Sequence, residues 1–138
     1  MNTSMKRFVV AGMLGGIVWG WVAMALNSAT GAFEFEGSFV HDLITFAVGG
    51  AVFGTIIAGF LCLVGDIIPF RNRLLRAVLV STSLWLLLKT GGTLLSHMDH
   101  ERYHLVTSQT IQGLFLAVIL GCIIWLFWKK EAKLRIEA

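Results

Sequence analysis

Four long apolar stretches, separated by short polar segments, are the feature that most limits how this chain can fold. They cover residues 8–26, 43–64, 75–95 and 111–128, and only the third contains charged side chains, Arg76 at its start and Lys89. A helix needs about 20 apolar residues to cross a bilayer. A helix satisfies its backbone hydrogen bonds internally, as the interior of a bilayer requires. A transmembrane β-barrel would instead show short segments that alternate in polarity, and these stretches are continuously apolar. We therefore predict an all-α integral membrane protein, a four-transmembrane-helix bundle that forms a single membrane domain over residues 1–138.

Composition excludes the main soluble classes. Only 14% of the residues are charged and 57% are hydrophobic, whereas soluble domains contain about 25% charged residues. Disordered chains have the opposite composition, and two cysteines are too few for a disulfide scaffold. The first stretch follows Lys6 and Arg7 as a signal peptide would, but it is longer than the usual apolar core of roughly 7 to 15 residues. We expect it to be a retained span.

The basic residues predict the orientation of the helices, because loops rich in Lys and Arg stay on the cytoplasmic side. Nine of the eleven basic residues fall before the first stretch, between the second stretch and the start of the third, or after the fourth: Lys6, Arg7, Arg71, Arg73, Arg76, Lys129, Lys130, Lys133 and Arg135. Both termini are therefore predicted to be cytoplasmic, with a bacterial inner membrane as the default location. The placement of basic residues on the cytoplasmic side accounts for the net positive charge of the chain. We therefore expect the lipid bilayer as a partner and expect no binding to nucleic acid.

Small residues recur at helical spacing in three of the stretches. Glycine every fourth residue lets two helix backbones approach closely in a membrane. The predicted packing positions are Gly12, Gly16 and Gly20 in the first stretch, Gly50 and Gly54 in the second, and Gly113 and Gly121 in the fourth. This pattern favours tight GxxxG packing within the bundle, or an oligomer of several copies.

Every histidine falls on the predicted outer side. His97, His100, Glu101 and His104 would share one face if the third helix continued beyond the membrane. Imidazole and carboxylate groups are ligands for zinc, copper, nickel or iron, and the first outer loop could add His41 and Asp42. A transition-metal site at the outer face is one hypothesis. A proton-responsive cluster and a simple solvated polar cap are the alternatives.

Lys89 is the second candidate site. It lies about 18 Å along the third helix from Ala77, in the outer half of the bilayer, where a charge indicates a function by default. Candidate acidic partners come from the first outer loop and the start of the second stretch; they are Glu34, Glu36 and Asp42. The alternative is that the long side chain snorkels to the outer surface, helped by a kink or end of the helix at Gly91 and Gly92.

Aromatic and basic side chains mark the predicted inner surface. Trp125 and Trp128 precede Lys129 at the end of the fourth stretch, where indoles favour the interface. The basic linker from Arg71 to Arg76 could pair with anionic headgroups.

Three functions remain open, and no catalytic constellation is evident, so a non-enzymatic role is favoured over an enzyme. The first is an accessory, structural or assembly subunit of a larger membrane complex, which fits short loops and several small-residue faces. The second is a small oligomeric transporter or channel for metal ions or protons that uses Lys89 and the outer histidines. The third is a membrane oxidoreductase with a metal or haem site at the outer face.

Overall fold

Four antiparallel helices make up the structure, which is a computed structural model that describes residues 3–31, 37–64, 67–70, 72–96 and 108–134. They are α1 (Thr3–Thr30), α2 (Phe39–Val64), α3 (Arg73–Ser96) and α4 (Ser108–Leu134). Each contains one of the apolar stretches and is long and apolar enough to cross a membrane. The prediction of an all-helical chain with four such helices is confirmed.

Local signals explain where three of the helices begin or end. Gly31 follows α1 with a φ of 61° and donates its N–H to the Asn27 carbonyl at 2.8 Å, as a left-handed C-terminal cap does. Ser38 precedes α2, and its hydroxyl accepts the His41 N–H at 3.4 Å. Asn72 precedes α3, and its side chain accepts the Leu74 N–H at 3.0 Å. Ser and Asn are preferred at such caps because they satisfy otherwise unpaired N–H groups.

The glycines of α1 pack directly on the backbone of α2. A Cβ built on Gly16 would overlap the Gly50 carbonyl oxygen, and one on Gly20 would overlap the Phe46 carbonyl oxygen. At Gly12, a Cβ would lie 2.5 Å from the Gly54 carbonyl oxygen. Gly50 and Gly54 meet α1 in the same way. Only residues without a side chain allow the two helix backbones to lie this close together, so α1 and α2 form a tightly packed pair.

The second pair, α3 and α4, uses glycine differently. A Cβ on Gly121 would lie 2.6 Å from both the Val78 Cα and the Ser81 Oγ, so the two backbones approach closely there. A Cβ on Gly113 would instead lie 2.6 Å from the Trp85 ring. This second glycine makes room for an indole rather than for a helix backbone.

A buried apolar cluster joins α2, α3 and α4 near the connection between α2 and α3. Its members are Ile57, Leu61, Ala77, Val80, Leu120 and Ile124, and all are less than a tenth exposed. Trp19 of α1 and Phe53 of α2 pack against this cluster, with ring centroids 5.8 Å apart. This cluster therefore lies toward one end of the bundle, whereas Ala23 and Met24 of α1 are buried farther from it.

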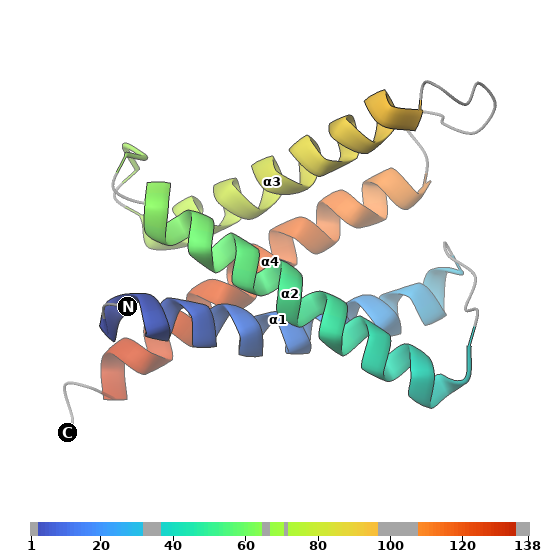
Figure 1. The fold of residues 1–138 in the computed structure, drawn as a ribbon, viewed down its shortest axis with the longest axis horizontal. Coiled ribbons are helices and arrows are strands. Elements are labelled where there is room, and N and C mark those ends of the chain that lie inside the picture. Colours follow the sequence, from blue (N-terminus) through green and yellow to red (C-terminus); the bar gives the residue numbers. More distant parts are fainter. Residues whose placement is uncertain (1–2, 32–36, 65–66, 71, 97–107, 135–138) are drawn as a thin grey trace.

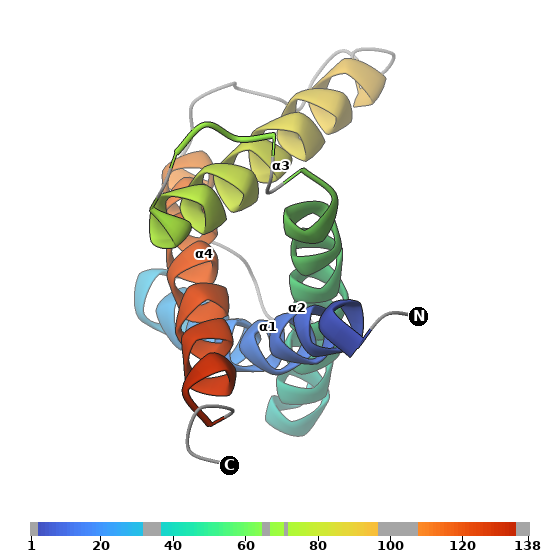
Figure 2. The ribbon, with the colours of Figure 1, turned by 90° about the vertical axis from the view of Figure 1, so that its left-hand side faces the viewer.

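From that end, α2 and α3 diverge (Figures 1 and 2). Among the described residues, α1 packs on α2 and α4, α3 packs mainly on α4, and the backbones of α1 and α3 do not approach each other closely. Much of the large apolar side-chain surface remains exposed, as on α2, where Val40, Ile44, Val48, Val52, Ile56, Phe60 and Leu63 point outward. Such a surface suits contact with lipid tails or with other apolar helices.

Candidate functional site

The predicted metal site falls largely outside the part of the chain that the structure describes. His97, His100, Glu101 and His104 all lie there, so only His41 and Asp42 can be placed. His41 is exposed at the start of α2, and its Nδ1 lies 3.6 Å from Oδ1 of the largely buried Asp42. Within the described ranges, no three His, Cys, Asp or Glu side chains come together as a metal site would require.

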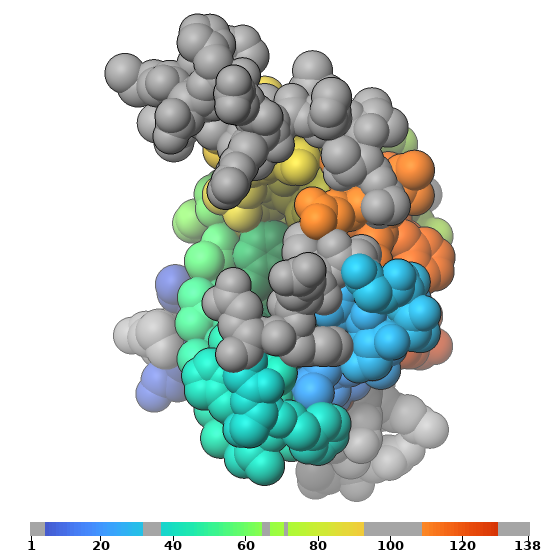
Figure 3. All heavy atoms as spheres, turned by 90° about the vertical axis from the view of Figure 1, so that its right-hand side faces the viewer, coloured from blue at the N-terminus to red at the C-terminus, as the bar shows by residue number. Residues whose placement is uncertain are grey.

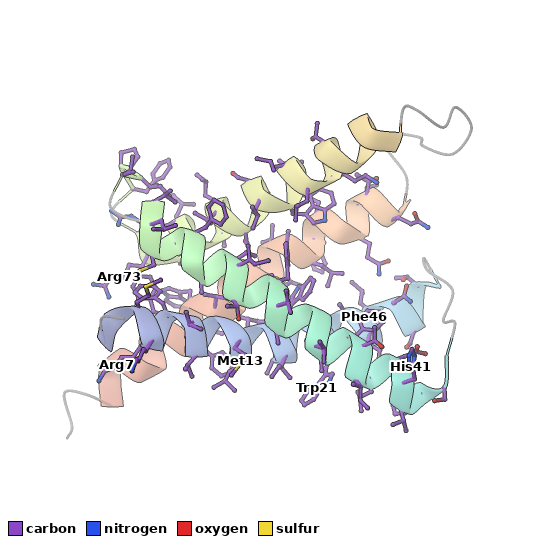
Figure 4. The ribbon with its side chains drawn as sticks, viewed as in Figure 1. Arg7, Met13, Trp21, His41, Phe46 and Arg73 are labelled. Atoms are coloured by element: carbon purple, nitrogen blue, oxygen red, sulfur yellow. The ribbon has the colours of Figure 1, made fainter. Side chains whose placement is uncertain are left out.

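Lys89 lies half-buried in the half of α3 that diverges from α2. Helix α3 continues through Gly91 and Gly92 to Ser96, so these glycines do not end it. Of the candidate acidic partners, Glu34 and Glu36 fall outside the described residues. His41, next to Asp42, lies on the α1 and α2 side of the bundle in Figure 4, whereas this half of α3 lies on the other. The divergence separates the third candidate partner from Lys89.

Polar side chains inside the bundle connect the helices to one another. Trp19 of α1 donates its indole N–H to the Leu116 carbonyl of α4 at 2.7 Å. The Thr30 hydroxyl of α1 bonds to Gln112 Oε1 of α4 at 2.9 Å, where the ends of these two helices lie side by side (Figure 3). The fully buried Ser81 of α3 donates to the Ala117 carbonyl of α4 at 2.7 Å. These bonds fasten both α1 and α3 to α4.

Sequence reasoning did not identify these links as a group. Gln112 was visible as a polar residue at the start of an apolar stretch, and Ser81 as a hydroxyl within one, but nothing in the sequence named their partners. Asn27, at 2% exposed, belongs to the same set of buried polar residues. Polar residues in a membrane span tend to face the bundle interior, which was the available signal.

One end of the molecule gathers basic and aromatic side chains. Arg7 of α1 and Arg73 of α3 both lie at the end where α1 begins and α3 starts (Figure 4), and Lys6, Arg76 and Lys129 lie near the same helix ends. We call this the basic end. There the rings of Phe8 and Trp128 lie 4.5 Å apart between centroids. The Arg73 guanidinium carbon lies 5.3 Å from the Trp128 ring centroid, and Lys129 Nζ lies 5.2 Å from that of Trp125.

Comparison with known proteins identifies no relative of this chain. No protein-family model, curated protein or solved structure matches it. The arguments on its function therefore rest on the residues themselves.

Proposed function

We propose that this protein is a non-enzymatic accessory, structural or assembly subunit of a larger membrane complex. The observation that carries the proposal is the use of the described interior polar groups. Trp19, Thr30 and Ser81 all bond to α4, so these three donors are used to hold helices together. Interhelical hydrogen bonds and small-residue contacts are how membrane helices associate.

The divergence of α2 and α3 supports the same proposal. Beyond the shared core, the far half of α3 is covered mainly by α4, and Leu86, Leu87 and Leu88 are about half exposed or more. A helix of another subunit could pack along this half. An acidic side chain on such a helix would pair with Lys89 of the same segment in addition to the interaction that Lys89 makes within this chain, since opposite charges pair inside membranes.

Site-specific photocrosslinking in native membranes tests this proposal. A photoreactive residue at Leu87, whose side chain is 66% exposed, should form a discrete adduct with a different membrane protein. The matched control is Trp21 on α1, 47% exposed and pointing away from α3 (Figure 4), where we expect no such adduct. Mild solubilisation and mass spectrometry should then identify the same partner in stoichiometric amount. A monomer without protein adducts at either position would refute the proposal.

An oligomeric transporter or channel for metal ions or protons is the second candidate. It is favoured by one observation, the half-buried Lys89 within a span. Adducts from Leu87 to a second copy of this chain, together with a homo-oligomer after solubilisation, would support it over the subunit proposal. Elemental analysis of the same preparation addresses the third candidate, because a membrane oxidoreductase would retain stoichiometric metal or haem.

We also propose that the basic end faces the cytoplasm, so that both termini are cytoplasmic, in a bacterial inner membrane. Lys6, Arg7 and Arg73 support this orientation through the preference of basic residues for the inner side. A reporter domain that works only in the cytoplasm should be active when it is fused to either terminus. A reporter that works only in the periplasm should be inactive at the same positions. Activity of a periplasmic reporter at a terminus would show that the orientation is the opposite one, and the subunit proposal would be unaffected.

A further inference from the structure

We propose that the basic end holds a binding site for the phosphodiester headgroup of an anionic phospholipid, centred on Arg73 and Trp128. The sequence alone suggested a diffuse attraction between a basic linker and anionic lipid. The structure adds a specific contact among three helices, because Arg73 begins α3, Trp128 lies near the end of α4, and Phe8 lies near the start of α1.

The depth of these residues suits a headgroup. Arg73 is the first residue of the α3 span, and Trp128 is the next-to-last residue of the α4 span, which covers Gln109–Lys129. Span ends lie at the boundary between hydrocarbon and headgroups, where amphipathic indoles are enriched. We therefore expect Arg73 and Trp128 to stand at the level of the lipid phosphates.

The packing around Trp128 prepares Arg73 to bind a phosphate. The ring of Phe8 holds one part of the half-buried indole, and the exposed Arg73 guanidinium lies over the indole ring. Stacking restricts a long side chain but does not neutralise it. The guanidinium keeps its planar set of N–H donors, which match two phosphate oxygens at once.

The surrounding charge favours an anion. Lys6, Arg7, Arg76 and Lys129 are further cations at the basic end. Arg76 donates from Nε to the Phe70 carbonyl, which holds this second guanidinium beside the start of α3. By sequence, the segments at this end carry nine basic residues against three acidic ones, Asp66, Glu131 and Glu137, and the one acidic side chain that the structure describes, Asp42, lies at the opposite end of α2. A lipid phosphate would thus meet a cationic surface, and its acyl chains would extend along the apolar helices.

Charge-conserving variants separate a built site from a general cationic field. Arg73→Lys keeps the charge but loses the planar fork, and Trp128→Leu removes the stacking surface at constant charge. The matched control Arg7→Lys makes the same chemical change at the same end, at a residue for which no stacking contact is proposed. Binding of phosphatidylglycerol is measured by native mass spectrometry of the full chain in neutral detergent, with phosphatidylcholine as the zwitterionic reference.

We expect Trp128→Leu to weaken phosphatidylglycerol retention about threefold to fivefold, as loss of a cation–π contact predicts. We expect Arg73→Lys to weaken it by a similar factor because lysine cannot bind two phosphate oxygens at once, while Arg7→Lys changes it little. Equal retention in all four proteins would refute the site in favour of a diffuse field. Inorganic phosphate should not displace the lipid; displacement at millimolar concentration would show a simple phosphate site instead. Helicity by circular dichroism confirms that each variant is folded, and Trp128→Met, which also lacks an aromatic ring, replaces Trp128→Leu if the latter is not.

Discussion

Gly16 and Gly50 face each other so closely that a Cβ on either one would overlap the backbone carbonyl oxygen of the other. This reciprocal contact joins α1 to α2 at the middle of both helices. No side chain can be accommodated there without separating the two helices, because the atoms in the way are backbone atoms that cannot move independently.

Replacement of Gly50 by alanine should destabilise the protein, whereas the same change at its neighbour Gly49 should not. A Cβ on Gly49 would meet nothing within 4 Å. We expect Gly50→Ala to cost about 1–3 kcal/mol of unfolding free energy, as overpacking typically does. Gly49→Ala should be neutral or slightly stabilising, since alanine favours helix. Reversible unfolding in mixed micelles measures both, and equal effects of the two variants would contradict the close contact.

Trp19→Phe should weaken the attachment of α1 to α4. The variant keeps an aromatic ring for packing on Phe53 but loses the N–H that bonds to the Leu116 carbonyl. Interhelical hydrogen bonds in membranes contribute about 0.6 kcal/mol on average and up to about 1.7 kcal/mol, so a loss in that range is expected. Trp21→Phe is the control, because Trp21 is exposed. A stability loss at Trp21 that matches the loss at Trp19 would argue against the bond.

Lys89→Met should leave membrane insertion intact or improve it. A lysine at the centre of a span opposes insertion by roughly 2.5–3.5 kcal/mol, and Lys89, near the end of the span Arg73–Gly92, opposes it by less; methionine removes that cost while keeping a long side chain. A glycosylation-mapping assay measures the inserted fraction of α3. Under the subunit proposal, the variant should insert yet lose part of its co-purifying partner. Full retention of the partner would leave Lys89 as a residue that merely snorkels.

Joint replacement of His97, His100 and His104 by alanine tests the metal hypothesis directly. The subunit proposal expects the variant to assemble normally, and both proteins to contain well under one metal ion per chain by elemental analysis. Stoichiometric metal in the native protein that disappears in the variant would instead support a metal centre at the outer face. Asp42→Asn serves as a further comparison, because this carboxylate was a candidate ligand from a separate loop.

Several candidate residues could be found from the sequence, but their partners could not. The spacing of Gly12, Gly16 and Gly20 predicts a smooth helix face, yet any of the other helices could have covered it. Gly113 and Gly121 are eight residues apart and lie on one helix face, yet the structure places an indole against the first and a helix backbone against the second. Similarly, Trp128 was identifiable as an interface residue, but not as the surface beneath Arg73.

The sequence by itself determined the helical, membrane-compatible nature of this protein, because a run of about 20 apolar residues is a local property that needs no partner. Tertiary structure alone decided that α1 pairs with α2, that Trp19 bonds to α4 and that α2 and α3 diverge. The physical reason is that lipid solvates every apolar helix face almost equally. The choice among faces therefore depends on small differences in shape and on single hydrogen bonds between residues far apart in the chain.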